Sequence, residues 1–173
     1  MNALFLDIDG VLNNYHLKEP FTFPNGYTQQ PVKGTQNKWN GLMGMDYDKV
    51  NLLNEILESN EWKVIISSSW YYSDSTVNAL KHFGFKYSDR IIGGTNRKSY
   101  GRGKQILDAV EDFKVTDFII LDDELFDITG NSEFVSNNMR EIFRDRVFKT
   151  NPYIGLTEKT VSNILKRLDY FII

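Results

Sequence analysis

Residues 3–13 read Ala3-Leu4-Phe5-Leu6-Asp7-Ile8-Asp9-Gly10-Val11-Leu12-Asn13, and this stretch decides the fold. A short apolar run ends abruptly in two carboxylates that are two residues apart, and a glycine follows them. Such a run predicts a buried strand that delivers acidic side chains to the edge of a sheet. Carboxylates held there repel one another unless a cation or a shared proton compensates them, so the pair indicates a metal site. Taken alone, the segment fits a strand that runs into a plain Asp-Gly turn equally well.

Two further segments are built in the same way. They are Val64-Ile65-Ile66-Ser67-Ser68-Ser69 and Phe118-Ile119-Ile120-Leu121-Asp122-Asp123, and each is an apolar run that ends in polar residues. Their apolar residues are continuous instead of alternating, which is typical of a parallel sheet that helices cover on both faces. The carboxyl ends of parallel strands gather along one rim, where ligands bind. We therefore expect these side chains to meet in space: Asp7, Asp9, Ser67, Asp122 and Asp123.

The segments between these strands predict helices. Asp46 is the expected N-cap of a first helix that runs toward residues 59–60, and either Ser73 or Asp74 is the expected N-cap of a second helix that ends at Gly84. A third helix is expected to begin near Lys104, and Thr157 is the expected N-cap of the last one. Short strands are expected at residues 91–92 and 146–150. The alternation of strands and helices predicts one α/β domain over residues 1–173, a three-layer Rossmann-like parallel sheet with helices on both faces.

Residues 14–45 break this rhythm. Prolines and glycines punctuate the segment and its apolar periodicity disappears. Insertions of this length tend to be functional, and this one leaves directly from the acidic strand. Its aromatic residues offer more apolar area than disordered segments usually carry. We favour an ordered loop or flap over a disordered insertion, and expect it to be the only, minimal cap over the site.

Composition excludes several classes of function. The net charge is −3, so no global basic field recruits nucleic acid or an anionic membrane. The chain has no cysteine, which excludes disulfides, thiolate metal sites and cysteine nucleophiles. The sequence enters its first strand without a cleavable apolar segment, and no apolar run is long enough to cross a bilayer. We expect a cytoplasmic protein without membrane association; the sequence does not give its oligomeric state.

Lys104 breaks a local rule, because it lies in the first turn of its predicted helix, where the helix dipole disfavours a cation. A helix N-terminus that carries an ammonium group is well arranged to hold a phosphate. Taken alone, Lys104 is better explained as a surface lysine.

Together these residues resemble the haloacid dehalogenase (HAD) superfamily of phosphohydrolases. Its four motifs occur in order as Asp7-Ile8-Asp9-Gly10, Ser67, Lys104, and Asp122-Asp123 with Asp127 behind them. A closer resemblance is to the small HAD-like domain of RNA repair proteins, through Ile66-Ser67-Ser68-Ser69-Trp70 and Lys149-Thr150-Asn151-Pro152-Tyr153-Ile154-Gly155-Leu156-Thr157. Relatives often carry an arginine after Ser-Ser-Ser-Trp, whereas Tyr71 stands here.

The resemblance implies a phosphatase that hydrolyses a phosphate monoester through an aspartyl-phosphate. Asp7 would be the nucleophile, Asp9 the general acid and base, and Mg²⁺ the cofactor. Implied ligands of the metal are Asp7, Asp9 through its backbone carbonyl, Asp122 and Asp123, with Asp123 or Asp127 holding a water on the metal. Ser67, Ser68 and Lys104 would bind the phosphoryl oxygens.

The expected substrate is less defined. A site with a minimal cap is open, which suits a nucleotide or a nucleic-acid end, although a small phosphate ester fits too. Aromatic and basic residues follow the second and precede the third motif, as in single-strand binding sites: Trp70, Tyr71, Tyr72, Arg97, Lys98, Tyr100 and Arg102. We favour the simpler interpretation that Trp70 is core and the basic loop solvated.

Two alternatives to a phosphatase remain. One is a catalytically silent HAD-like module that binds phosphate or a partner; the complete acid set argues against it. The other is a receiver-type signalling domain, which also gathers acids, a hydroxyl and a lysine on a parallel sheet, but whose phosphate acceptor follows a later strand.

Overall fold

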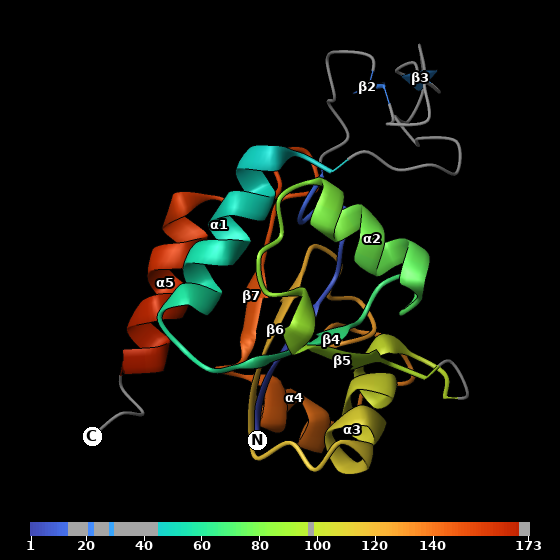
Figure 1. Cartoon of the computed structure of the whole chain (residues 1–173). Coiled ribbons are helices and arrows are strands. Elements are labelled where there is room, and N and C mark those ends of the chain that lie inside the picture. Colours follow the sequence, from blue (N-terminus) through green and yellow to red (C-terminus); the bar gives the residue numbers. More distant parts are fainter. Residues whose placement is uncertain (14–20, 23–27, 30–44, 97–98, 170–173) are drawn as a thin grey trace.

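The computed structural model describes residues 1–13, 21–22, 28–29, 45–96 and 99–169 (Figure 1). Its centre is a five-stranded sheet in the order β5-β4-β1-β6-β7, in which all four pairings are parallel. The strands are β1 (Asn2–Leu6), β4 (Lys63–Ile66), β5 (Ile91–Gly94), β6 (Asp117–Asp122) and β7 (Val147–Lys149). This architecture confirms the predicted Rossmann-like α/β fold.

Helices cover both faces of the sheet (Figure 1). On one face, apolar residues of β1, β4 and β6 pack against α1 (Tyr47–Glu58), α2 (Asp74–His82) and α5 (Glu158–Asp169). On the other face they pack against α3 (Arg102–Asp112) and α4 (Asn137–Phe143). A 3₁₀ turn, η1 (Ser88–Arg90), leads into β5. The continuous apolar runs of the strands arise because alternate side chains enter these two cores.

Side chains near the helix starts explain where the helices begin. The Asp46 carboxylate accepts the amide of Asp48 at 2.9 Å, and the Ser73 hydroxyl accepts the amide of Thr76 at 3.2 Å. Thr157 accepts the amide of Thr160 at 3.2 Å. These contacts confirm the predicted starts, because an oxygen that accepts an amide of the first turn satisfies a donor the helix leaves open.

The strand order reverses beside β1. The chain passes from β1 to β4 and β5 on one side, then crosses to β6 and β7 on the other. β1 and β6 are therefore the neighbours at the switch point, and the amide of Asp7 donates to the carbonyl of Leu121 at 2.9 Å. Ligands of open parallel sheets bind at this place, beyond the carboxyl ends of the strands.

The predicted flap over residues 14–45 lies mostly outside the described residues. Within it, β2 (Phe21–Thr22) and β3 (Thr28–Gln29) form an antiparallel pair. Met45, at its end, is buried in the core under α1. Whether the segment acts as a cap stays a prediction.

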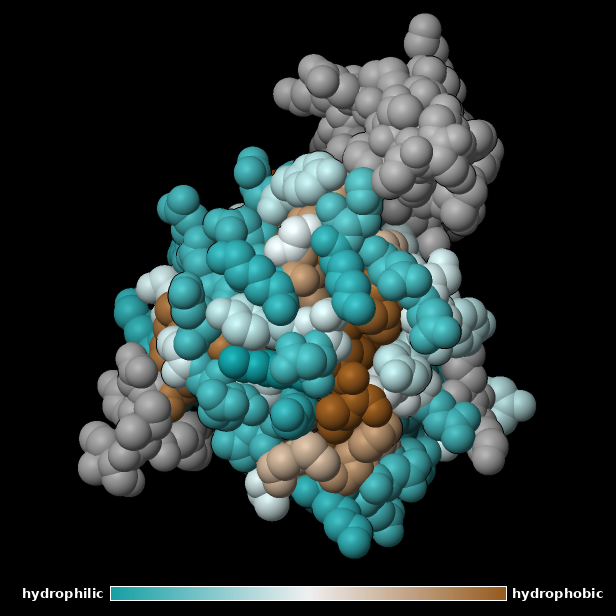
Figure 2. All heavy atoms as spheres, viewed as in Figure 1, coloured by the Kyte–Doolittle hydropathy of each residue, from teal (hydrophilic) through white to brown (hydrophobic). Residues whose placement is uncertain are grey.

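The surface of the described part is mostly polar on the face drawn in Figure 2, where hydrophobic residues form one band near the centre and a smaller group toward the left edge. Most large apolar side chains are instead in the two core clusters. Among the described residues, no helix combines the length and the apolar character that crossing a membrane requires.

Candidate active site

Three carboxylates converge at the switch point. Asp7 directly follows β1, Asp122 is the last residue of β6, and Asp123 comes next. One oxygen of each lies within 4.8 Å of the others. Asp7 and Asp122 are only 5% and 1% exposed, so this negative charge has little contact with water. The predicted convergence of acids from distant parts of the chain is therefore present for these three residues.

Burial and mutual repulsion make the three groups hard to ionise. Burial is the main cause that raises the pKa of Asp122 to about 8, and the neighbouring Asp7 adds to it. Burial, followed by Asp7, raises the pKa of Asp123 to about 6. The pKa of Asp7 is also raised, by burial, although the nearby Arg102 works in the opposite direction. A bound cation would lower these pKa values, because it favours the charged forms of the carboxyl groups.

Arg102 is the cation that reaches these acids. It is the first residue of α3, and its Nη1 lies 3.2 Å from an oxygen of Asp122 and 3.7 Å from one of Asp7. The same nitrogen donates to the backbone carbonyl of Ser67. One guanidinium thus links the ends of β1, β4 and β6. Among the described residues, three acidic groups thus share one cation.

Lys104, the residue predicted to bind phosphate, points elsewhere. Its ammonium group pairs with Asp108 one turn along α3, and its side chain is 52% exposed. That contact is the first cause of the lowered pKa of Asp108. The predicted phosphate-binding role of Lys104 stays a prediction, and the geometry favours Arg102, which the sequence reasoning assigned only to a basic loop.

Ser67 and Ser68 lie at the end of β4, beside the acids. The Ser67 amide donates to the carbonyl of Leu6 at 2.8 Å, which ties this turn to β1. The Ser67 hydroxyl is buried and has no hydrogen-bond partner among the described residues. The Ser68 hydroxyl bonds to Asp7 and lowers its pKa, which burial nevertheless keeps raised. A buried hydroxyl without a partner is costly unless a ligand satisfies it.

Asp9 lies outside the group of three and is held by three donors. Asn13 Nδ2 and Trp70 Nε1 donate to one carboxylate oxygen at 2.9 and 3.0 Å. The Ser69 hydroxyl donates to the other oxygen at 3.1 Å. Trp70 also packs against the core, as expected, but its indole N–H is a contact that the sequence did not reveal.

The turn after Asp9 requires Gly10. Its φ is +71°, and a Cβ there would lie 2.4 Å from Cγ of Asp123. The Thr150 hydroxyl donates to the Gly10 carbonyl at 2.7 Å, and the Leu156 amide donates to the Val11 carbonyl at 2.8 Å. The segment from Lys149 to Thr157 therefore holds the turn after Asp9 in place through these hydrogen bonds. This is a physical role for the C-terminal segment that the sequence shares with the HAD-like domain of RNA repair proteins.

Asp127 has a structural contact instead of a place in the group of three. Its carboxylate accepts the amide of Arg102 at 2.8 Å, and its carbonyl accepts the amide of Gly103 at 3.0 Å. These contacts cap α3, whose own N-cap residue, Gly101, offers no side chain. Asp127 thereby fixes the position of Arg102, and its predicted contact with a water on the metal stays a prediction.

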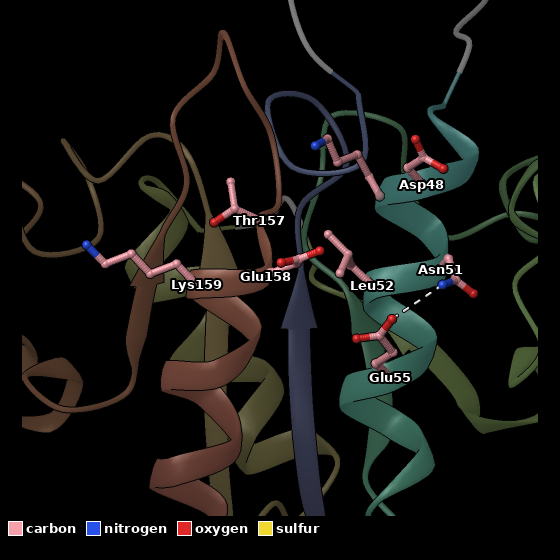
Figure 3. A pocket seen from close by; sticks show the side chains of 8 residues that line it. Asp48, Asn51, Leu52, Glu55, Thr157, Glu158 and Lys159 are labelled. Atoms are coloured by element: carbon pink, nitrogen blue, oxygen red, sulfur yellow. Dashed lines mark hydrogen bonds between the residues drawn. The ribbon is translucent and has the colours of Figure 1, made fainter.

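Of two cavities in the described part of the chain, one adjoins the site. The other, of about 590 Å³, lies between α1 and the start of α5 and is lined by residues such as Asp48, Glu55 and Thr157, none of which belongs to the acidic cluster (Figure 3). The cavity that adjoins the site has a volume of about 360 Å³, and Ser68 and Arg102 help to line it. Of the two, only this cavity is placed to hold part of a molecule that reacts at Asp7.

The fold and the site define the class: an open α/β sheet with an acidic centre at its switch point. Residues 3–161 match the family described as the HAD domain in Swiss Army Knife RNA repair proteins. The chain belongs to this family, which confirms the resemblance predicted from the sequence. Neither a curated protein nor a solved structure matches the chain.

Proposed function

We propose that this protein is a magnesium-dependent phosphatase that hydrolyses phosphate monoesters through an aspartyl-phosphate on Asp7. One observation carries the proposal: three carboxylates, two of them almost fully buried, meet within 4.8 Å of one another, and Arg102 alone among the described residues forms an ion pair with them. Family membership supports a HAD-like phosphatase and makes this chemistry the natural use of such a centre.

The donors fit Mg²⁺. This ion prefers oxygen ligands, and it is usually bound through one or two carboxylates together with waters and substrate phosphate. Asp7 and Asp122 would hold it, with Asp123 beside them. When bound, the ion would neutralise charge on the transferring phosphoryl group. The unpartnered Ser67 hydroxyl supports the same interpretation, because a phosphoryl oxygen would supply its missing acceptor.

The first chemical step would be an in-line displacement by Asp7. A carboxylate oxygen of Asp7 bonds to phosphorus while the bond between phosphorus and the ester oxygen breaks. The departing oxygen takes a proton from Asp9, and the leaving group is released as the free alcohol. Asn13 and Trp70 would keep the Asp9 carboxyl group in place for this transfer.

The second step would return the enzyme to its starting form. A water molecule attacks the phosphorus of the aspartyl-phosphate and gives its proton to Asp9. The bond between phosphorus and the Asp7 oxygen breaks, which releases inorganic phosphate and the Asp7 carboxylate. Both steps develop charge on the phosphoryl oxygens, and we propose that Arg102 and Ser67 stabilise it.

We propose that the substrate is the phosphorylated end of a nucleic acid or a nucleotide. The family's printed description refers to RNA repair proteins, which supports this choice. The cavity beside Ser68 and Arg102 is partly open, so a leaving group larger than a small metabolite can extend from it. The basic residues 97–98, which suggested the same class of substrate, lie outside the described residues.

The proposal is tested by phosphate release from p-nitrophenyl phosphate and from 3′- and 5′-phosphorylated oligonucleotides, with Mg²⁺ and with a chelator. We expect hydrolysis that requires the metal. Asp7→Asn should lower the rate by about a thousandfold or more, because the nucleophile is lost. Asp9→Asn should slow turnover and let the phosphoenzyme accumulate, which acid quench and mass spectrometry would detect.

Undiminished hydrolysis by purified Asp7→Asn would rule the mechanism out. A wild-type protein that binds inorganic phosphate but hydrolyses no ester would instead be the silent phosphate-binding module. Stable labelling of Asp7 without turnover would indicate a receiver-like function.

A further inference from the structure

A polar cavity adjoins the acidic centre and has an exposed tyrosine in its lining. We call it the Tyr100 pocket; its volume is about 360 Å³, and its lining includes Ser69, Thr95, Ser99, Tyr100, Arg102 and Gln105. The pocket is continuous with the site, since Ser69 bonds to Asp9 and Arg102 bonds to Asp122. A group that leaves from a phosphate held at Asp7 therefore has this pocket beside it.

One wall of the pocket carries Tyr100. Its side chain is 81% exposed, and its ring stacks on Phe134 with centroids 5.9 Å apart and an angle of 19° between the ring planes. Phe134 is itself 45% exposed. Because the ring of Tyr100 is this exposed and lines the cavity beside the acids, it is accessible for a flat group of a ligand to stack on.

The fold holds this aromatic pair in place. Gly101 has a φ of +81°, and a Cβ there would lie 3.0 Å from Cβ of Phe134, so the glycine allows the close approach of the two segments. Gln105 Nε2 donates to the backbone carbonyl of Ser99 at 2.9 Å. The Ser99 hydroxyl donates to Asp108, which is also the partner of Lys104. The wall that carries Tyr100 is thus anchored to α3 on one side and rests on Phe134 on the other.

We propose that the Tyr100 pocket is a nucleoside subsite: it receives the terminal nucleoside of the substrate, with the sugar inside and the base stacked on Tyr100. This inference rests on the proposed function, because it places the scissile phosphate at Asp7. The subsite adds what the acidic centre cannot supply, a preference for esters that carry a base. A cavity of this volume is at the lower end of ligand-binding pockets, which suits one nucleoside.

The chemistry of the lining favours a nucleoside over an aryl phosphate such as phosphotyrosine. Hydroxyl and amide side chains of Thr95, Ser99 and Gln105 line the same pocket as Tyr100. The polar groups match the hydroxyls of a sugar, and the ring of Tyr100 matches a base. An aryl phosphate carries a flat ring but no sugar, so it would leave these polar groups without partners.

The test compares a 3′- and a 5′-phosphorylated dinucleotide with their counterparts that lack the terminal base. Tyr100→Ala should lower the preference in kcat/KM for the base-bearing substrate by about tenfold, mainly through KM, because stacking on an aromatic side chain is lost. Tyr100→Phe should restore the preference, since it keeps the ring. Tyr47→Ala is the matched control: Tyr47 is another half-exposed tyrosine packed on a phenylalanine, Phe83, and does not line the pocket.

Equal losses on both substrates, or no change in Tyr100→Ala, would overturn the subsite while leaving the phosphatase intact. A second measurement separates the two proposals: binding of a mononucleotide to Asp7→Asn, followed by fluorescence, with and without Tyr100→Ala. If mononucleotide binding depends on Tyr100 but the wild-type protein hydrolyses no phosphate ester, the subsite would be supported and the phosphatase proposal refuted. Absence of such binding would refute the subsite.

Discussion

The two ends of β6 each carry an aspartate, and their surroundings differ. Asp117, at the start of the strand, is paired by two arginines: Arg146 at 3.4 Å and Arg167 at 3.2 Å. Asp122, at the end of the same strand, shares one arginine with Asp7, and further acids lie beside it. Asp117 thus has two arginine partners for one carboxylate, whereas Asp122 and Asp7 share a single arginine.

We propose that this difference separates a structural acid, Asp117, from a functional one, Asp122. The ion pairs of Asp117 join β6 to α5 and to the residue before β7, and they are complete within the chain. The acids at the other end have one arginine between them, and we propose that a cation from outside balances their charge. Groups whose pKa values are strongly shifted in a cleft are candidates for function, and the raised pKa values of Asp122 and Asp123 fit this rule.

The comparison predicts opposite effects of one substitution at the two ends. Asp122→Asn should lower metal-dependent hydrolysis by about a thousandfold, because several kcal/mol of charge stabilisation by the metal are lost. The same change should make the metal-free protein more stable at neutral pH, since it removes a buried repulsion. Asp117→Asn should keep the activity within about threefold and cost roughly 1 kcal/mol of stability, because it removes the ion pairs with two arginines.

Both effects are read from phosphate release and from urea denaturation of each variant. An Asp122→Asn protein that keeps its activity, or an Asp117→Asn protein that loses it without unfolding, would reverse the assignment of the two ends.

A second pair of substitutions compares the two cations of the first turn of α3. Arg102→Met should lower kcat by about a hundredfold, the scale of losing one donor to the developing charge. Lys104→Met should change kcat by less than about threefold, since its ammonium group pairs with Asp108. Steady-state kinetics with Mg²⁺ decide between them. A larger effect at Lys104 would restore the role predicted from the sequence.

A third substitution tests how Asp9 is held. Trp70→Phe keeps a ring in the core but removes the N–H that lies 3.0 Å from Asp9. We expect about a tenfold loss of kcat for alkyl phosphates, whose leaving oxygen needs a proton. The loss should be much smaller for p-nitrophenyl phosphate, which leaves readily without one. Equal losses on both esters would mean that Trp70 acts only through packing.

A further prediction concerns stability as a function of pH and needs no substrate. The folded pKa values of Asp122 and Asp123 are about 8 and about 6, above the ordinary value of 3.8. At pH values between the ordinary and the folded pKa of each group, the folded chain therefore binds more protons than the unfolded chain. The metal-free protein should therefore lose stability as the pH rises, from about 4 to about 8 through Asp122 and from about 4 to about 6 through Asp123, by at most about 1.4 kcal/mol per pH unit for each group. Denaturation across this range should show a flatter profile in Asp122→Asn; an unchanged slope would contradict the assigned repulsion.

Much of the fold was predictable because its signals are local and strong. Continuous apolar runs that end in polar clusters identified β1, β4 and β6, and capping residues such as Asp46 and Ser73 marked helix starts. The short helix α4 was missed: over only seven residues, Met139 and Phe143 are too few buried positions to establish a helical period. Ser136, which caps it, was the signal that could have revealed it.

The acids of the site were also predictable, because they are attached to the ends of strands. The cation was not. Arg102 and Lys104 are two residues apart, and positions so spaced on a helix point about 200° apart around its axis. Only one of them can face the acids, and the sequence does not say which. The start of α3 decides it: Asp127 accepts the amide of Arg102 from another segment, a contact that no local pattern reveals.

The central claim is that the acidic end of β6 is a divalent cation site and the other end is not. Calorimetric titration with Mg²⁺ at about pH 8.5, where the carboxylates are ionised, tests it most directly. We predict one ion bound per chain in the wild type and in Asp117→Asn, and no measurable binding in Asp122→Asn. Binding that survives in Asp122→Asn, or none in the wild type, would contradict the account.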